Sequence, residues 1–474
     1  MNKEFFAGKT VLVMGLGRFG GGVDVAEYAH GAGARVIVTD LAPSERLRDS
    51  LRKLEAFPDI EFHLGLHDPA DFERADIVVA NPAVPPDNTY LDLARRHGRY
   101  VTSQVNIFFQ LCPATIIGIT GANGKSTTAA LTAHLLRASV KGRTDDGSSE
   151  KKGAQYASDT QNERVWLSGN IGNHPLLTVV DQISPGDLVV LELSSFQIEQ
   201  LSQIRKAPKV ALLTNLMPNH LDRYGTFANY CAAKENIFKF QTLDANSPAV
   251  SIFNAEDKVA RGWFDKYRTQ TGRTCIQFSP DDVGEAIREC FALPGLANLS
   301  NLAGAMAVAR HFGANKNRIA GSVSGFRALP HRLEFVAQKG AVRWYNDSKA
   351  TTPQSTIAAL RAFDRPAIVI AGGYDKNLPL DELGQEVAEH AKAAILLGQT
   401  AEKIATAIRS RSGAAGCTQI RIVSSLSEAV RSASLLAERG DVVVLSPACA
   451  SYDMFDNFEQ RGNEFARLVR NISC

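Results

Sequence analysis

The chain contains the stretch Thr120-Gly-Ala-Asn-Gly-Lys-Ser-Thr127, which follows a predicted strand at Thr115–Thr120 and precedes a helix-like stretch at Thr127–Arg137. In a loop of this kind the backbone N–H groups converge on phosphate, and the helix N-terminus adds a partial positive charge. The Lys125 side chain would reach the β- and γ-phosphates, and the Ser126 hydroxyl would ligate Mg²⁺. The stretch therefore predicts a nucleotide-phosphate loop on a parallel α/β sheet.

The loop is a variant of the strict phosphate-loop pattern. The first glycine of that pattern would stand at Ile119, and the nearest glycine is Gly121. Its position between a strand and a helix still favours phosphate binding over a chance match. The residues expected to contact ATP here are Gly121, Asn123, Gly124, Lys125, Ser126 and Thr127.

Length and composition limit the classes of protein that the chain can belong to. It has 474 residues, of which 45% are hydrophobic and 22% charged, so disordered, collagenous and coiled-coil chains are excluded and two to four domains are expected. Its 52 basic and 50 acidic residues leave a formal charge of +2, which disfavours nucleic-acid binding. Seven scattered cysteines form no CxxC pair, and no apolar run is long enough for a membrane helix. These features predict a cytoplasmic protein without a membrane or nucleic-acid partner.

Short β-branched runs alternate with helix-like stretches in three series, which is typical of parallel α/β domains. Cys112-Pro113 ends the first series, and Gly325–Pro330 separates the second from the third. The polar segment Lys141–Arg164 is interpreted as a surface insertion without chemistry. The expected strands are Thr10–Gly15, Arg35–Asp40, Glu61–Gly65, Asp76–Asn81, Tyr100–Ser103; Thr115–Thr120, Leu188–Ser194, Val210–Asn215, Ala249–Asn254; Val342–Asn346, Ala367–Ala371, Ala393–Leu397, Gln419–Val423 and Asp441–Ser446.

A second glycine-rich loop, Gly15-x-Gly17-x-x-Gly20, follows the first strand, and Asp40 ends the next strand about twenty residues later. This pattern matches the dinucleotide-binding fingerprint, and by itself it would indicate an NAD-dependent dehydrogenase. The same loop geometry suits any diphosphate, including that of a nucleotide-sugar, and a tight turn without ligand is a further reading. The residues expected to bind the diphosphate substrate are Gly15, Leu16, Gly17, Arg18, Asp40 and Asn81.

Polar residues also follow the central strands, where open α/β sheets place their ligands. Glu192 follows an apolar strand, and His220 follows Val210–Asn215. A carboxylate and an imidazole near a phosphate loop could hold Mg²⁺ ions that neutralise a transferring phosphoryl group. Taken singly, Glu192 could be a helix cap and His220 a packed loop residue; their shared place in the phosphate-loop domain favours function. The spacing of Lys234 indicates only a solvent-exposed lysine on a helix.

The third series repeats this arrangement. Asn346-Asp-Ser-Lys-Ala-Thr351, Gly372-Gly-Tyr-Asp-Lys376 and Ser446-Pro-Ala-Cys-Ala-Ser451 each follow a strand. Two lysines with nearby hydroxyls suit a substrate with more than one carboxylate. Cys449 is interpreted as a buried small residue because no histidine motif lies near it in sequence. The residues expected to line this crevice are Lys349, Thr351, Lys376 and Ser451.

Together these motifs resemble the ATP-dependent Mur ligases of peptidoglycan synthesis, over the whole chain. The stretches at 118–127 and Ser168-Gly-Asn-Ile-Gly172 belong to the wider family. The stretches at 192–197, 329–334, 346–351 and 446–451 are more particular to its D-glutamate-adding member. The family usually has Asp where this chain has Asn219, and His where it has Ala297, which leaves the details of the adenine and metal contacts open.

The resemblance implies an α/β, three-domain Mur ligase architecture. Rossmann-like N- and C-terminal domains would stand around a central P-loop ATPase domain. The expected domains are 1–112, which would bind the UDP substrate, 113–326, which would bind ATP, and 327–474, which would bind the incoming amino acid. A monomer is expected, and a domain closure is expected before chemistry.

The resemblance also implies roles for single residues. Lys125, Glu192, His220 and Lys234 would be catalytic. Ser126, Glu192, His220 and Lys234 would serve two Mg²⁺ ions, with Lys234 carbamylated by CO₂. Asn170 would contact the muramyl substrate. The residues that match ATP-site positions are Asn298, Asn301, Arg332 and Asp347, and those that match the glutamate pocket are Lys349, Thr351, Lys376, Ser451, Tyr452 and Phe458.

The implied reaction joins UDP-N-acetylmuramoyl-L-alanine to D-glutamate through an acyl phosphate, with release of ADP and phosphate. A related ligase that uses L-glutamate or another amino acid remains an alternative. So do a folylpolyglutamate-synthase-like ligase, an NAD-dependent dehydrogenase and a non-catalytic nucleotide-sugar sensor.

Overall fold

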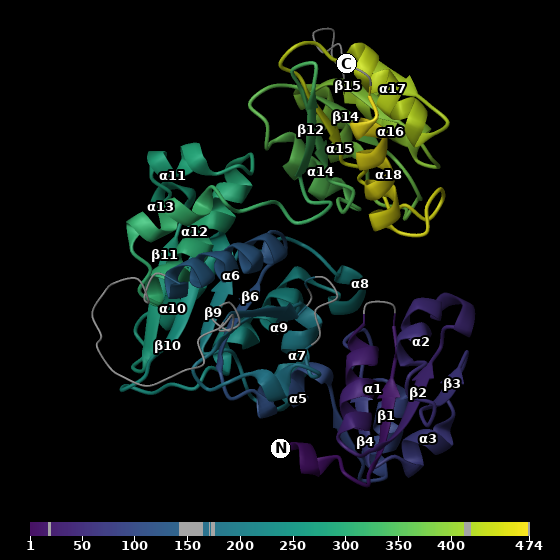
Figure 1. Ribbon diagram of the computed structural model, residues 1–474, viewed down its shortest axis with the longest axis vertical. Coiled ribbons are helices and arrows are strands. Elements are labelled where there is room, and N and C mark those ends of the chain that lie inside the picture. The colour runs from purple at the N-terminus through teal and green to yellow at the C-terminus, as the bar shows by residue number, and fades with distance from the viewer. Residues whose placement is uncertain (18–19, 142–164, 170, 172–175, 412–418, 473–474) are drawn as a thin grey trace, which may run out of the picture. The chain divides into compact units, whose positions relative to one another are not determined.

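A computed structural model describes residues 1–17, 20–141, 165–169, 171, 176–411 and 419–472. The described chain forms three largely parallel sheets, each flanked by helices (Figure 1). One sheet falls within each of the ranges 1–112, 113–326 and 327–474. The α/β class is therefore confirmed, with one sheet in each of the three ranges expected from the sequence. Apart from Lys141, the polar insertion predicted over 141–164 lies outside the described residues.

The N-terminal sheet contains five parallel strands in the order β3-β2-β1-β4-β5. Alternation along β1 places Val11 and Val13 on one face and Leu12 and Met14 on the other. Helices α1, α2 and α5 cover the first face, and α3 and α4 the second. The strands are β1 Thr10–Met14, β2 Arg35–Asp40, β3 Glu61–Leu64, β4 Ile77–Ala80 and β5 Tyr100–Thr102; the helices are α1 Gly21–Gly31, α2 Arg48–Leu54, α3 Pro69–Arg74, α4 Thr89–Arg96 and α5 Gln104–Leu111.

The central sheet is fully parallel, with the order β11-β10-β9-β6-β8-β7. Two of its strands, the edge strands β7 and β11, were not expected from the sequence. The strands are β6 Thr115–Thr120, β7 Val165–Gly169, β8 Leu188–Glu192, β9 Val210–Leu213, β10 Ala249–Asn254 and β11 Arg273–Phe278; the helices are α6 Lys125–Lys141, α7 Ser195–Gln203, α8 Leu221–Tyr224, α9 Phe227–Lys239, α10 Lys258–Tyr267, α11 Glu285–Cys290, α12 Leu296–His311 and α13 Lys316–Val323.

The C-terminal sheet has the order β12-β13-β17-β14-β15-β16, and its edge strand β12 runs antiparallel to β13. Helices α14, α15 and α16 cover one face, while α17 and α18 cover the other. The strands are β12 Glu334–Lys339, β13 Val342–Asn346, β14 Ala367–Ala371, β15 Ala391–Leu396, β16 Gln419–Ile422 and β17 Val442–Leu445; the helices are α14 Pro353–Leu360, α15 Asp381–His390, α16 Ala401–Arg411, α17 Leu426–Leu436 and α18 Phe458–Arg470.

The chain divides into two compact units, residues 1–279 with 304–319 and residues 280–303 with 320–474. Within the first unit, buried Asp24 of α1 accepts hydrogen bonds from the backbone N–H groups of Leu176, Leu177 and Thr178, at 2.8–3.0 Å. Arg223 of α8 donates to Pro82 O, 3.2 Å away. These bonds join the N-terminal and central sheets, which also share one hydrophobic core. In the described part of the chain, the helices are too short or too polar to span a bilayer.

A half-buried histidine on β3 makes the stability of the N-terminal sheet depend on pH. The His63 ring contacts Asp71 at 2.5 Å and Glu61 at 3.0 Å. The hydrogen bond to Asp71 is the main cause that raises the pKa of His63 above its ordinary 6.5. Because the folded-state pKa is raised, the stabilisation is complete below pH 6.5 and disappears as the pH rises through the folded-state value.

We expect His63→Gln to lower the melting temperature by about 1–3 °C under mildly acidic conditions, since partly exposed ion pairs contribute little. The difference from the unsubstituted protein should vanish at alkaline pH. Melting curves across a pH series measure both. His97→Gln, at an exposed helix end, is the control, and a difference that persists at alkaline pH would contradict the assignment.

Candidate active site

The phosphate loop lies between β6 and α6 and is held in place by the end of β9. Ala122 N and Asn123 N donate to Asn215, to its backbone O at 2.8 Å and its Oδ1 at 2.9 Å. Thr214 Oγ1 donates to Asn123 O at 2.6 Å. Gly121 has a φ of +150°, and a Cβ there would lie 1.9 Å from Thr214 Oγ1. Only glycine fits this position, which gives the variant loop its physical reason.

At the start of α6, two predicted residues face two different partners. Ser126 Oγ donates to Glu192 Oε2 at 2.6 Å, and both side chains are buried. Lys125 Nζ donates to Ala122 O at 2.8 Å, within the loop itself. The neighbouring Thr127 is also buried. The structure thus brings the carboxylate at the end of β8 against the hydroxyl at the head of α6, a contact that the sequence did not indicate.

Lys234 is the least accessible ionisable group of this region. It extends from α9, its side chain is only 1% exposed, and its Nζ donates to Thr120 Oγ1 at 3.0 Å. Burial lowers its pKa well below the ordinary value, and the charge of Lys125 lowers it further, while Glu192 acts in the opposite direction. A lowered pKa increases the share of the neutral, nucleophilic amine at a given pH.

His220 begins α8 with a left-handed backbone, at a φ of +52°. Its ring packs on Phe196, with 4.9 Å between ring centroids, and lies 6.4 Å from the ring of Tyr230. Desolvation lowers its pKa, and Lys234 and Lys125 lower it further against the pull of Asp222. The imidazole is therefore neutral near pH 7, the form in which histidine accepts a proton or a metal ion.

The donor set near the phosphate loop fits Mg²⁺. Ser126 and Glu192 offer a hydroxyl and a carboxylate oxygen, the hard ligands that Mg²⁺ prefers, and substrate phosphate and water usually complete its shell. Within the described ranges, His, Cys, Asp and Glu side chains form no cluster of three or more that could hold a metal by themselves. A metal here would therefore depend on the nucleotide, as is usual for phosphoryl transfer.

A pocket in the N-terminal sheet lies at the carboxyl ends of β1 and β4. Gly15 and Asn81, both predicted, line it together with Gln104 of α5. Asn81 Nδ2 donates to Gly15 O at 3.2 Å. Asp40 Oδ2 accepts from Gly17 N at 3.0 Å, so Asp40 orders the loop from outside this pocket.

Leu16, Arg18 and Asn170 were also predicted to bind the muramyl nucleotide. The Leu16 side chain is fully buried in the core, so only its backbone could contact a ligand. Arg18 and Asn170 lie outside the described residues.

The other predicted ATP-site residues lie in the second compact unit. Asn301 Nδ2 donates to Asn298 Oδ1 at 3.3 Å, one turn apart on α12. Asp347 accepts from Ser446 Oγ at 2.8 Å and from Leu333 N at 3.1 Å. Burial raises the pKa of Asp347 to about 7, and the charge of Arg332 acts in the opposite direction.

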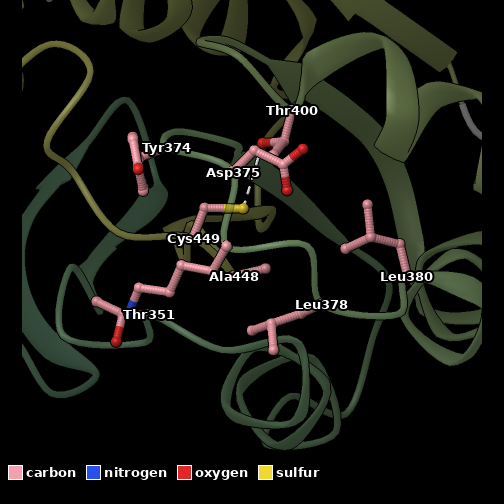
Figure 2. Close-up of a pocket in the computed structure, with 9 residues that line it drawn as sticks. Thr351, Tyr374, Asp375, Leu378, Leu380, Thr400, Ala448 and Cys449 are labelled. Atoms are coloured by element: carbon pink, nitrogen blue, oxygen red, sulfur yellow. Dashed lines mark hydrogen bonds between the residues drawn. The ribbon is translucent and has the colours of Figure 1, made fainter.

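The C-terminal sheet carries a pocket at the ends of β14, β15 and β17 (Figure 2). Thr351 and Lys376 line it as predicted, and so does Cys449, whose Sγ lies 3.2 Å from Thr400 Oγ1. The other predicted residues of the glutamate site surround this pocket without lining it. Lys349 Nζ lies 5.1 Å from the centroid of the Phe458 ring, Ser451 is buried, and Tyr452 is exposed with its ring 6.2 Å from that of Tyr374.

Three polar residues of this pocket, Tyr374, Asp375 and Thr400, were not singled out from the sequence. Thr400 follows β15 in Gly398-Gln-Thr400, so the rule that polar residues after strand ends meet at one sheet edge could have found it. Tyr374 and Asp375 lay inside a quoted motif, but only their neighbour Lys376 was selected, because a positive charge was expected to matter most.

The raised pKa of Asp347 gives a second pH-dependent prediction. The stability that the neutral Asp347 carboxyl contributes to the fold is fully present below its ordinary pKa of 3.8 and is lost as the pH rises through about 7. We expect Asp347→Asn to melt about 3 °C or more above the unsubstituted protein near pH 8, because it avoids burying a charge. This advantage should shrink in acid. Asp456→Asn, at an exposed position, is the control, and an equal effect at both pH values would refute the assignment.

Comparisons with known proteins assign this architecture to a family. Residues 119–309 match the Mur ligase middle domain, and residues 331–449 match the Mur ligase glutamate ligase domain. The chain is 38% identical to a UDP-N-acetylmuramoylalanine–D-glutamate ligase of Roseiflexus sp., over 98% of this chain and 99% of that one. It is 34% identical to the enzyme of the same name from Clostridium tetani, over 99% and 98%.

Solved structures agree at the level of the fold. The UDP-N-acetylmuramate-alanine ligase of Thermotoga maritima superimposes with a TM-score of 0.58 at 17% identity, over 98% of this chain and 99% of that one. A folylpolyglutamate synthase from Mycobacterium tuberculosis gives 0.52 at 13% identity, over 78% and 95%. With its middle and glutamate ligase domains matched and its full-length relatives more than 30% identical, the chain belongs to the Mur ligase family.

Proposed function

We propose that the chain is an ATP-dependent ligase that adds D-glutamate to UDP-N-acetylmuramoyl-L-alanine, with release of ADP and phosphate, in peptidoglycan precursor synthesis. The contact between Ser126 and Glu192 at the head of α6 is the main structural support for the proposed chemistry. A hydroxyl and a carboxylate oxygen, both typical ligands of Mg²⁺, lie there beside the phosphate loop. The names of the full-length relatives support the choice of substrates.

The proposed reaction has two chemical steps. The L-alanyl carboxylate attacks the γ-phosphorus of ATP, ADP leaves, and an acyl phosphate forms. The amine of D-glutamate then attacks the acyl carbon, and phosphate leaves as the amide forms. Mg²⁺ bound at Ser126 and Glu192 would neutralise the phosphoryl oxygens. Lys125 would turn from Ala122 O to the same oxygens, and the neutral His220 can take up a proton nearby.

The lowered pKa of Lys234 supports a carbamate at that position. The neutral amine attacks CO₂, a C–N bond forms, and one proton leaves, so a potential cation becomes an anion. Thr120 Oγ1, 3.0 Å from Nζ, would accept from the N–H of the carbamate, while its own hydroxyl donates to Leu193 O at 2.7 Å. An anion there would offset the charge of Lys125 and could serve a metal ion together with Glu192.

The remaining parts of the proposal concern organisation. Three domains, 1–112, 113–326 and 327–474, would each bind one substrate: the UDP substrate in the Gly15 pocket, ATP at the Gly121 loop and D-glutamate in the Thr351 pocket. The enzyme would act in the cytoplasm as a monomer, without nucleic-acid or membrane partners. All three of its substrates are small molecules.

The decisive experiment measures ADP release from ATP with UDP-N-acetylmuramoyl-L-alanine and D-glutamate, L-glutamate or no amino acid. We expect release that requires both the muramyl nucleotide and D-glutamate. Lys125→Ala should lose about 100-fold or more of the turnover, since it removes a charge from the transferring phosphoryl group, while binding of the UDP substrate survives. ADP release that ignores both substrates, or activity that depends on NAD and not on ATP, would overturn the proposal.

The carbamate at Lys234 can be tested separately. We expect activity to fall in CO₂-depleted buffer and to return with bicarbonate, since a carbamate forms reversibly. Lys234→Ala should be nearly inactive and insensitive to bicarbonate. ¹³C NMR with labelled bicarbonate measures the modification directly. Lys239→Ala, at the end of the same helix, is the matched control, and full activity of Lys234→Ala would refute the role.

A further inference from the structure

Arg461, in the first turn of α18, is a buried arginine in the C-terminal sheet domain. Its side chain is only 3% exposed. Its Nε donates to Ser348 Oγ at 3.0 Å, and its Nη2 donates to Ser348 O at 2.9 Å and to Cys449 O at 3.1 Å. Its Nη1 donates to Ala450 O at 3.3 Å. One guanidinium group thus ties together two loops that are about one hundred residues apart in sequence.

These two loops form the amino-acid pocket. Ser348 lies three residues before Thr351, and Cys449 lines the pocket itself (Figure 2). A third loop runs close to the same group, because a Cβ added to Gly373 would lie 3.3 Å from Arg461 Nη1. That loop continues into Tyr374 and Lys376, which also line the pocket. Arg461 therefore holds two of the strand-end loops that line the pocket and lies close to a third.

The helix that carries Arg461 is fitted closely to these loops. Ser348 Oγ donates to Phe458 O at 2.8 Å, and Asn346 Nδ2 donates to Gly462 O at 3.2 Å. A Cβ on Gly462 would lie 2.2 Å from His331 Nδ1, so glycine is required for this approach. The position of the guanidinium is consequently fixed by its own helix as well as by its acceptors.

The charge of Arg461 has no ion-pair partner. Its acceptors are three backbone carbonyls and a hydroxyl, and among the described residues no carboxylate lies within 4.0 Å of it. Asp453 acts on it only from a distance. Burial lowers its pKa to about 10, so it remains a cation at neutral pH. Burying a cation without an ion pair lowers the stability of the fold. We therefore expect Arg461 to have a function beyond holding the loops together.

We propose that Arg461 is a positioning residue of the amino-acid pocket whose charge also makes the pocket selective for an amino acid of net negative charge. It holds the Ser348, Gly373 and Cys449 loops at one spacing, and its field acts on the ligand through those loops without direct contact. The inference rests on the proposed function, since it assigns glutamate to this pocket. Glutamate has a net charge of −1 at neutral pH, whereas glutamine is neutral with almost the same shape.

The test compares Arg461→Met, which removes the charge, with Arg461→Lys, which keeps it. For each protein we would measure the KM for D-glutamate, the inhibition constant of D-glutamine and the KM for ATP. Arg461→Met should raise the KM for D-glutamate about tenfold or more, the usual effect of losing a charged buried interaction. It should raise the inhibition constant of D-glutamine clearly less and leave the KM for ATP unchanged. Arg467→Met, an exposed arginine of the same helix that pairs with Glu464, should change none of them.

The outcomes separate the two proposals. Failure of the unsubstituted enzyme to respond to D-glutamate would reject the proposed function itself. If that enzyme responds but Arg461→Met weakens glutamate and glutamine equally, the charge has no role and the inference is overturned. If Arg461→Met does not fold, Arg461→Lys decides: retained preference for glutamate supports the inference, and loss of that preference overturns it.

Discussion

The central site depends on the close approach of Gly121 to the end of β9. No side chain fits between the loop and Thr214, so the loop lies directly against the neighbouring strand, and Asn215 fixes its next two N–H groups. Parallel register then places the end of β8 on the other side of β6, which brings Glu192 to Ser126. The arrangement of phosphate loop, carboxylate and hydroxyl follows from this one contact between backbone and side chain.

Buried ionisable groups lie at the candidate sites in both compact units. Lys234 and Glu192 lie at the phosphate loop, while Asp347 and Arg461 lie beside the strand ends of the C-terminal sheet. Each has been removed from water, which disfavours its charged form or demands hydrogen bonds in compensation. Lys234 and Asp347 respond with shifted pKa values, and Arg461 is compensated by carbonyl oxygens. Each of these buried groups therefore has a free-energy cost that its hydrogen bonds or its shifted pKa only partly offset.

The strands whose bounds agree residue for residue with the prediction include β6, β10, β13 and β14, which are apolar, β-branched runs and largely buried. The missed strands β7, β11 and β12 lie at sheet edges. An edge strand is exposed along one side, so polar residues such as Glu334, Gln338 and Lys339 are compatible with it and weaken the apolar pattern. For the same reason the sequence contained no sign that β12 would run antiparallel to β13.

The sequence by itself determined the α/β class, the three series of strands, and the loops at 15–20 and 121–126, because these features depend on local patterns of hydrophobicity and glycine. It also pointed to Glu192, His220, Lys349, Thr351 and Lys376 through their places after strand ends. Only the tertiary structure decided that Lys234 is buried against Thr120, that Thr400 and Tyr374 line one pocket with Thr351 and Cys449, and that Arg461 ties the Ser348 and Cys449 loops together. Burial and long-range contact arise when segments far apart in the chain pack together, and no local pattern records them.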